Sequence, residues 1–418
     1  MEKKLLIISY VYPPDNGIGG RRWSKFAKCL AERGNKVFVI TATPDKDNDY
    51  STQVLDGAEV HRVKSPYPRI LRFMGKMNLW NKIDYKLSKA YFSFINKGNI
   101  YDTSIGWDKN LVPAIISLIK KEGIKNIVVT APPYRHMYYV SKLKSIYPDI
   151  NIILDFRDPW TELEALSAML HTSPKRFTAE KELEKQTLAS IDYVVTVSEG
   201  RTQLFEKLVP ETNKLVTITN GIDLKDYSFL SSEPKISNGY ISIVHAGTLN
   251  PGYTKYIKAL VDFININKEV LLNAKVKFEF CGHASAEMIN ILRQAPSEIV
   301  VNLGILPQKE ALRILNRAAA GLIIHKEGYD NIHFITKLYE YMALKKKIIY
   351  LSNPNAHPLR NLLSKERIGV TFYPENLNLL LEFIVNIDKS NDLSYANFDI
   401  SPYEIDNLSK KVESLLKS

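Results

Sequence analysis

Short β-branched apolar runs alternate along the chain with longer amphipathic segments, and this alternation predicts buried parallel strands joined by crossover helices. In the first half we expect strands at residues 5–9, 36–41, 126–130, 151–155 and 193–197. After the segment TNGID at residues 219–223 the pattern restarts, with strands expected at 241–246, 275–281, 299–301, 320–324 and 347–351. The helices expected at 23–33, 111–121, 309–318 and 336–344 have the length that parallel crossovers require.

This restart predicts an α/β protein with two doubly wound, Rossmann-like lobes. We expect an N-terminal lobe over residues 1–210, a C-terminal lobe over 216–395, and a helical tail over 396–418 that returns to the N-terminal lobe. Open parallel sheets bind ligands beyond the carboxyl ends of their strands. Two such lobes therefore predict a site in an interlobe cleft.

Composition narrows the class of protein. The chain has 418 residues, 45% apolar and 24% charged, which suits a folded protein with a sizeable core. The net charge of +11 favours anionic partners, and the two cysteines, Cys29 and Cys281, suit a reducing compartment. The apolar run that follows Met1 ends at Pro13-Pro14, which predicts a buried first strand and no signal peptide. The chain has no run of 18 consecutive apolar residues, so we expect no membrane-spanning helix of normal length.

One segment interrupts the alternation. Residues 62–97 hold nine basic residues against one acid, Asp84, with seven aromatic residues interleaved. This composition suits an acidic membrane surface, where lysine and arginine meet lipid headgroups and aromatic rings lie at headgroup level. The alternative is an ordinary insertion whose aromatic rings pack on the first lobe. No nucleic-acid-binding motif accompanies the segment, so we expect no nucleic-acid partner.

Polar residues after the predicted strands of the first lobe are candidates for a site. Gly19 and Gly20 lie in a glycine-rich loop that opens a helix, which favours an anion or makes a plain tight turn. Asp155, Arg157 and Asp158 end a buried strand, where charges face a site or form an internal lock. We expect His136 at the same rim, in a functional or a structural role.

The second lobe offers a diphosphate site. The strand that ends in His245 runs into the small-residue turn Gly247-Thr248, and Lys255 follows on the next helix as a cation that would stabilise a departing nucleotide. The alternative for Lys255 is a solvated surface lysine. Glu340 lies one turn after Thr336 at a helix start, so it could accept hydrogen bonds from a ribose diol or simply satisfy the helix dipole.

Several of these segments together resemble one family. They are YPPDNGIGGRRW, DFRDPW, VVTVSEG followed by TNGID, HAGTL, VNLGILPQKEALRIL and ITKLYEYMA. In this order the chain resembles a retaining glycosyltransferase of the GT-B fold, in the family-4-type group that builds bacterial surface polysaccharides. The resemblance covers nearly the whole length.

The resemblance implies an activity and a location. The enzyme would transfer a hexosyl or N-acetylhexosaminyl group with retention from a nucleotide diphosphate sugar, preferably a UDP-sugar, to a glycan or polyprenyl-linked glycan. It would act in the cytoplasm, on the inner face of the cell membrane, with no cofactor and no metal. Asp45 and Asp47, the one pair of carboxylates that superficially suits a metal, lie in a polar loop.

The resemblance also assigns residues to roles. His136, Asp155 and Lys255 would be catalytic, and Arg157 and Asp158 would contact the sugar or the acceptor. Donor binding would fall to Gly19, Gly20, Gly247, Thr248, Gly304, Thr336, Lys337 and Glu340.

Three positions depart from the family pattern. Ile332 stands where the first of two glutamates is usual, Thr248 where an arginine is usual, and Ile335 where a proline is frequent. Because of these departures, two alternatives stay open. One is a non-catalytic nucleotide-sugar-binding or scaffold protein, and the other is a GT-B sugar-nucleotide epimerase.

Overall fold

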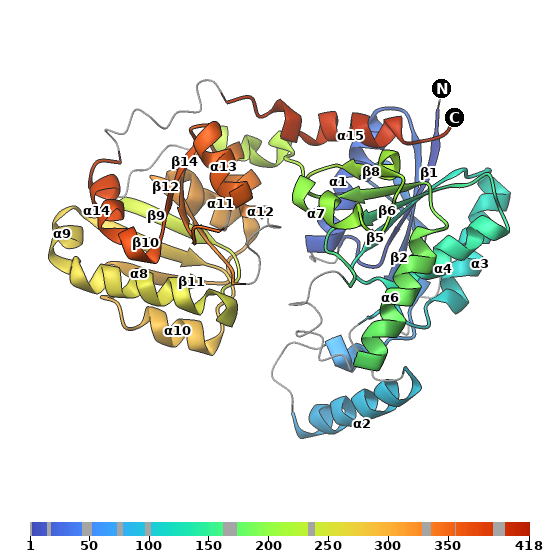
Figure 1. Cartoon of the computed structure of the whole chain (residues 1–418), viewed down its shortest axis with the longest axis horizontal. Helices are drawn as coiled ribbons and strands as arrows, with labels where there is room; N and C mark the ends of the chain where they lie inside the picture. The colour runs from blue at the N-terminus through green and yellow to red at the C-terminus, as the bar shows by residue number, and fades with distance from the viewer. Residues whose placement is uncertain are drawn as a thin grey trace. The chain divides into compact units, whose positions relative to one another are not determined.

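The computed structural model describes residues 2–14, 18–43, 52–72, 78–96, 102–161, 174–232, 239–327, 336–355, 357–387 and 398–418. The chain divides into two compact units. The first comprises Met1–Thr219 together with Ile405–Ser418, and the second comprises Asn220–Glu404 (Figure 1). Each is a parallel α/β unit, so the predicted two-lobed α/β fold class is confirmed.

The first unit is built on a sheet of eight strands in the order β3-β4-β2-β1-β5-β6-β7-β8. Its strands are β1 (Lys4–Ser9), β2 (Lys36–Thr43), β3 (Thr52–Leu55), β4 (Ala58–Lys64), β5 (Asn126–Ala131), β6 (Asn151–Phe156), β7 (Tyr193–Thr196) and β8 (Leu215–Thr217). Every neighbouring pair is parallel except β3 and β4. The strand order reverses direction at β1, which puts a topological switch point between the carboxyl ends of β1 and β5.

Alternating side chains of β1 form the two faces of this sheet. Leu6 and Ile8 belong to an apolar cluster with residues of α3 and α4, whereas Leu5 and Ile7 belong to a second cluster with residues of α1 and α15. Apolar residues on both faces explain why the strand sequence is almost continuously hydrophobic. The α-helices of this unit are α1 (Ile18–Glu32), α2 (Leu79–Ile95), α3 (Asp108–Glu122), α4 (Arg135–Ser141), α6 (Pro174–Leu188), α7 (Glu199–Phe205) and α15 (Ile405–Ser414).

The second unit has a six-stranded parallel sheet in the order β11-β10-β9-β12-β13-β14. Its strands are β9 (Ile241–Ala246), β10 (Val276–Cys281), β11 (Val300–Gly304), β12 (Ala320–Ile324), β13 (Lys347–Leu351) and β14 (Gly369–Phe372). Counted along the chain this is the order 3-2-1-4-5-6 of dinucleotide-binding folds, and its switch point lies between β9 and β12.

Helices cover both faces of the second sheet. Ile243 belongs to the cluster that includes residues of α8, α10 and α14, and its neighbour Val244 belongs to the cluster that includes residues of α11, α12 and α13. The α-helices are α8 (Thr254–Ile266), α9 (Lys268–Asn273), α10 (Ala286–Leu292), α11 (Gln308–Arg317), α12 (Thr336–Ala343), α13 (His357–Lys365) and α14 (Leu377–Val385). Both switch points are therefore framed by helix starts and strand ends, the usual setting for a ligand.

Each predicted strand coincides with an observed strand, with ends that differ by no more than three residues. Four observed strands, β3, β4, β8 and β14, were not predicted. Because β8 pairs with β7 in the first sheet, the first unit runs to Thr219, beyond the expected limit of 210, and the second begins at Asn220 instead of 216. Residues 398–404, expected in the returning tail, belong to the second unit, and the part of the tail in the first unit starts at Ile405.

Candidate functional site

Glycines end three neighbouring strands of the second sheet. Gly247 follows β9, Gly282 follows β10 and Gly304 ends β11, with positive φ values of 146°, 133° and 68°. The Gly247 N–H donates to the Cys281 carbonyl at 2.6 Å, and the Gly282 N–H donates to the Gly304 carbonyl at 2.7 Å. A Cβ on Gly282 would lie 2.5 Å from the Gly247 carbonyl oxygen, so the two backbones approach as only glycine allows. At this edge of the sheet the neighbouring turns therefore pack backbone against backbone.

Lys337 lies directly over the first of these turns. It is the second residue of α12, and a Cβ on Gly247 would lie 2.1 Å from its Cε. Lys337 Nζ donates to His245 Nε2 at 2.8 Å. His245 Nδ1 lies 3.0 Å from the Leu322 carbonyl, which can only accept, so the proton of the neutral ring is on Nδ1 and Nε2 accepts. Strand β9, strand β12 and the start of α12 thus fix one ammonium group at the switch point.

Burial controls the charge of this pair. Desolvation lowers the pKa of Lys337 to about 7, against the opposite effect of the Glu340 carboxylate. Burial, reinforced by the nearby Lys337 ammonium, holds the pKa of His245 well below its usual range. Because an anion favours the charged form of a neighbouring lysine, a phosphate at this turn would raise the pKa of Lys337 again.

Tyr341 holds α12 against the sheet. Its hydroxyl accepts from the Ala246 N–H at 3.2 Å and lies 3.2 Å from the carbonyls of Val244 and Leu322. Gly321 makes room for the ring, since a Cβ there would lie 2.4 Å from Tyr341 Cδ2. The position of Lys337 relative to the glycine turns is therefore set by a buried contact one helical turn away.

The other donor-binding candidates of this unit lie around the same edge. Thr248 follows Gly247 and is exposed, and Glu340 lies one turn along α12 from Lys337, close enough to influence its pKa. Thr336 begins α12, but its side chain lies outside the described part of the chain, as do Ile332 and Ile335.

Lys255, the catalytic cation expected from the sequence, is exposed to solvent. It lies on α8, with Nζ 5.7 Å from the centre of the Tyr256 ring. No hydrogen bond or ion pair within the described residues joins Lys255 to Gly247 or Lys337. Its catalytic role stays a prediction, and the cation that the structure brings to the glycine turn is Lys337.

Asp155, at the end of β6 in the first unit, is fully buried and fully bonded. Its carboxylate accepts from Arg22 Nε at 3.2 Å, Arg22 Nη2 at 3.0 Å, Trp23 Nε1 at 2.7 Å and Thr130 Oγ1 at 2.7 Å. Arg22 also donates to the carbonyl of Ile218 at 2.7 Å. The internal lock considered from the sequence is therefore present, but its arginine is Arg22 and not Arg157.

Arg157 and the helix-opening glycines meet at the same edge. Arg157 donates to the carbonyls of Ala131 at 3.0 Å and Pro132 at 2.6 Å, and burial lowers its pKa. A Cβ on Gly19 would lie 2.3 Å from Arg157 Nη1, and one on Gly20 would lie 2.9 Å from the Val11 carbonyl oxygen. Close packing inside the unit therefore explains why both positions are glycine, and their role in donor binding stays a prediction.

His136 and Asp158 complete the predicted set. His136 has no exposed surface, its Nε2 lies 3.1 Å from the Thr130 carbonyl, and burial lowers its pKa to about 3. Asp158 is part-exposed and accepts from Arg201 Nη2 at 2.9 Å. Asp155 and His136 both bond Thr130, so the structure brings them to one strand end, where His136 is neutral.

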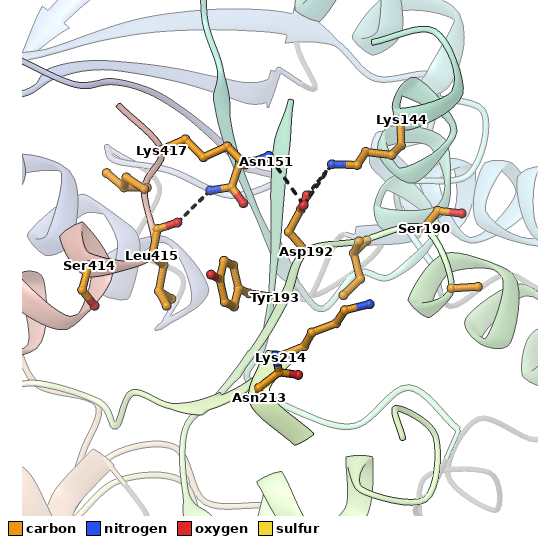
Figure 2. Close-up of a pocket in the computed structure, with 13 residues that line it drawn as sticks. Lys144, Asn151, Ser190, Asp192, Tyr193, Asn213, Lys214, Ser414, Leu415 and Lys417 are labelled. Carbon is orange, nitrogen blue, oxygen red and sulfur yellow. Dashed lines mark hydrogen bonds and ion pairs between the residues drawn. The ribbon is translucent and has the colours of Figure 1, made fainter. Parts of the chain in front are cut away.

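A pocket of about 560 Å³ lies at the opposite edge of the first sheet. It is lined at the amino ends of β6 and β7 and by the C-terminal segment, and Figure 2 shows Lys144 and Lys417 reaching Asp192 and Asn151 reaching the Leu415 backbone. Lys144 Nζ contacts Asp192 Oδ2 at 2.7 Å, and Asn151 donates to the Leu415 carbonyl at 2.8 Å. The Asn151 bond joins the C-terminal segment to the sheet, and the pocket contains none of the predicted site residues.

The described residues contain neither a metal-binding cluster nor a helix that could span a membrane. No group of three His, Cys, Asp or Glu side chains there could hold a metal ion, and Asp45 and Asp47 lie outside the described part of the chain. Metal independence stays a prediction. No helix in the same residues is both long and apolar enough to cross a membrane.

Sequence reasoning missed His245 and Gly282 as members of this site. His245 was noted only as a residue preceding the turn, because its partner Lys337 is 92 residues away and is brought to it by the strand order. Gly282 carries a detectable signal, since a glycine directly after a buried strand marks close backbone approach.

Comparison with known proteins establishes the fold. No protein-family model and no curated protein matches the sequence. Among solved structures, sucrose-phosphate synthase from Thermosynechococcus elongatus is similar, with a TM-score of 0.63, 14% identity, and coverage of 99% of this chain and 98% of that one. The α,α-trehalose-phosphate synthase of Burkholderia xenovorans, solved with glucose-6-phosphate, gives a TM-score of 0.62, 10% identity and 99% coverage of both chains.

A third similar structure is HepE from Anabaena in complex with UDP and glucose, with a TM-score of 0.59, 12% identity and 99% coverage of both chains. These neighbours are GT-B glycosyltransferases, and the two Rossmann-like units of this chain match their fold over nearly its whole length. At such low identity the likeness establishes the fold alone.

Proposed function

We propose that this protein is a retaining glycosyltransferase that moves a hexosyl or N-acetylhexosaminyl group from a nucleotide diphosphate sugar, preferably a UDP-sugar, to a glycan or polyprenyl-linked glycan. The proposal includes the family-4-type assignment, a role in bacterial surface polysaccharide synthesis and a place on the cytoplasmic face of the membrane. Its support from known structures is that similar proteins hold UDP with glucose, or glucose-6-phosphate.

One observation carries the proposal: Lys337 lies over the Gly247 turn at the switch point of the second sheet. A diphosphate needs close backbone approach and a cation, and this edge offers both. The glycines let the Lys337 side chain and the neighbouring turn lie close to the backbone at this edge. Lys337 supplies the positive charge, and Glu340 on the same helix is placed to accept from a ribose diol.

The chemistry requires charge stabilisation at the leaving group. The bond between the anomeric carbon and the phosphate oxygen breaks, and a bond to the acceptor oxygen forms on the same face of the sugar. The acceptor hydroxyl proton passes to the leaving diphosphate. Negative charge that develops on the diphosphate is stabilised by the Lys337 ammonium, which takes the place of the arginine that the family usually has at the position of Thr248.

The donor half of the proposal is tested by titrating the protein with UDP-, GDP- and CDP-sugars in a calorimeter. Glu340→Ala should weaken binding of the preferred donor by roughly 1–3 kcal/mol, the scale of a lost hydrogen-bonded charge. Glu382→Ala, at an exposed glutamate of α14, is the matched control and should bind as the wild type does. Unchanged affinity in Glu340→Ala would move the ribose contact elsewhere.

The transfer half needs a product. Labelled donor is incubated with bacterial membrane lipids, and labelled glycolipid is expected, with the anomeric configuration of the donor retained. Donor binding without any transfer would favour the scaffold alternative. Conversion of the free donor sugar to its epimer would favour the epimerase.

A further inference from the structure

Helix α2 carries an unusual exposed apolar surface. Trp80 is 77% exposed and Phe94 85% exposed, and Leu79, Ile83, Leu87 and Tyr91 are each at least 42% exposed. Among the described residues, the helix with the next largest number of exposed large apolar side chains, α14, has two, Leu379 and Val385. An apolar surface of this kind marks an interaction site, since single exposed apolar residues are the normal case.

The apolar residues of α2 form one stripe. At about 100° per residue, Leu79, Ile83, Leu87, Tyr91 and Phe94 fall with Trp80 within about one third of the helix circumference. The opposite side packs on the first unit: Phe92 is buried, and its ring lies 4.9 Å from the Tyr67 ring in an edge contact. In Figure 1 α2 lies at the periphery of the first unit, away from its sheet. The stripe therefore faces away from the body that holds the helix.

The charges of α2 are sorted as well. Lys82, Lys86 and Lys89 are all exposed, and at the same helical spacing they line one flank of the stripe. The one acid of the helix, Asp84, lies on the other flank. Arg62, part of the same basic segment of the sequence, instead donates to the Pro13 carbonyl at 2.6 Å. Within the described part of the chain, α2 is therefore the helix on which a broad apolar stripe and exposed lysines lie together.

We propose that α2 docks the protein on an anionic lipid bilayer, with its axis in the membrane plane. The stripe of Leu79, Trp80, Ile83, Leu87, Tyr91 and Phe94 enters the boundary between headgroups and acyl chains, and the three lysines contact acidic headgroups. The inference deepens the proposed membrane location and rests on that part of the proposed function alone. Beyond a membrane location, it specifies which helix face binds, that this face inserts to the headgroup–acyl boundary, and that the lipid is anionic.

Charge complementarity selects the membrane over a protein partner. Protein interfaces are depleted of lysine, whereas interfacial helices combine Trp, Phe and Leu on one face with lysine beside it. A second copy of this chain would place the lysine flank beside a like-charged one or require acids that α2 lacks, apart from Asp84. Self-association is kept as an outcome of the test.

The test measures flotation of the full chain with vesicles of phosphatidylcholine alone and of phosphatidylcholine with about one-third phosphatidylglycerol. The stripe variant is Trp80→Gln with Phe94→Gln, and its control, Val54→Gln with Ile266→Gln, removes two apolar side chains that are 75% and 82% exposed outside α2. The charge variant is Lys82→Gln, Lys86→Gln and Lys89→Gln, with exposed Lys120, Lys185 and Lys411 changed to Gln as its control. Circular dichroism and denaturation midpoints verify that each variant folds.

The wild type and both controls should float with the anionic vesicles, and the stripe variant should lose about tenfold or more of its partition coefficient. The charge variant should lose up to about fivefold per lysine on anionic vesicles and little on neutral ones. A wild type that does not float, or a stripe variant that floats as well as its control, would overturn the proposal. The proposal would also be overturned if sedimentation velocity showed a wild-type dimer that is lost only in the stripe variant, while the stripe variant binds vesicles as the wild type does.

Donor binding in solution separates the two proposals. Titration with UDP-sugar should give the same affinity for the wild type and the α2 variants, because α2 and the glycine turns belong to different units. Flotation without donor binding in any of these proteins would count against the proposed transferase and leave the docking surface standing.

Discussion

The carboxyl edges of the two sheets contain similar residue types but use them differently. At the first sheet, Asp155 receives four hydrogen bonds from Arg22, Trp23 and Thr130, and His136 is buried. At the second sheet, Lys337 is part-buried, with a neutral histidine as its hydrogen-bond partner. At the first edge the charge is paired with a counter-charge, whereas at the second edge a lysine lies over a glycine turn with a neutral partner.

This difference separates structural from functional polar residues. A carboxylate whose lone pairs are all used stabilises the fold, because each bond compensates for desolvation. A lysine that shares its proton donors with a neutral ring is incompletely compensated, and an incoming anion would supply the missing interaction. We therefore expect substitutions at the first edge to change stability and substitutions at the second edge to change ligand affinity.

The largest expected effect is on stability, at the first edge. Asp155→Ala leaves the buried Arg22 guanidinium without its carboxylate and should lower the free energy of unfolding by about 3–5 kcal/mol. Urea denaturation followed by circular dichroism measures the change. Glu211→Ala is the control, because Glu211 and its ion-pair partner Lys214 are both reached by solvent and their pair should contribute little to the free energy of unfolding. Equal losses in the two variants would contradict the assignment of Asp155 to the fold.

The next effect is on donor affinity, at the second edge. Lys337→Ala should weaken UDP-sugar binding by about 1.5–3 kcal/mol, the range for hydrogen bonds to charged groups, without lowering the denaturation midpoint. Calorimetric titration measures it. Lys255→Ala, the other candidate cation, should have the smaller effect because Lys255 lies exposed over the Tyr256 ring. A larger effect for Lys255→Ala would restore that residue to the role expected from the sequence.

A smaller effect distinguishes His136 by pH. Burial lowers its pKa to about 3, whereas in the unfolded chain the pKa is about 6.5. Between pH 6.5 and 3 the unfolded chain therefore binds a proton at this residue that the folded chain does not. Stability from the neutral ring is thus complete above pH 6.5 and decreases as the pH falls. Relative to His136→Gln, the wild type should lose about 2 kcal/mol between pH 7.5 and pH 5, measured by urea denaturation. Parallel pH curves for the two proteins would show that the histidine titrates normally.

The smallest effect concerns the pH dependence of donor binding. The pKa of Lys337 is about 7 in the free protein, and a bound diphosphate raises it. The affinity for the donor is therefore highest below pH 7. It declines as the pH rises above 7, by up to about tenfold per pH unit. Titration between pH 6 and 8.5 should show this decline and proton uptake on binding. Lys337→Arg should flatten the profile, since arginine stays protonated.

Strand positions could be predicted from the sequence because the central strands are buried on both faces and read as apolar runs. Four strands at or next to the sheet edges could not be predicted: β3 is exposed, β4 alternates polar and apolar residues, and β8 and β14 are short. Local apolar pattern carries no information about such strands beyond what a loop would show.

The candidate site was partly predictable for a similar reason. Gly247, Gly304 and Lys337 were identified from local motifs, and the structure brings them to neighbouring strand ends. Their link through His245 depends on β9 lying beside β12, which is a property of strand order and not of spacing along the chain. In the first unit the sequence indicated a lock around Asp155, but no local pattern could distinguish Arg22 from Arg157 as its partner.

The return of α15 to the first unit gives the two units unequal independence. Leu408, Val412 and Leu416 share an apolar cluster with Trp23 and Phe26 of α1, and Arg33 pairs with Asp406 and Glu413. A fragment ending at Thr219 would leave this side of α1 in water, whereas the second unit is one uninterrupted stretch. Separation of the halves by cleavage would therefore damage the first far more than the second, unless the last helix were rejoined to it through a permuted chain.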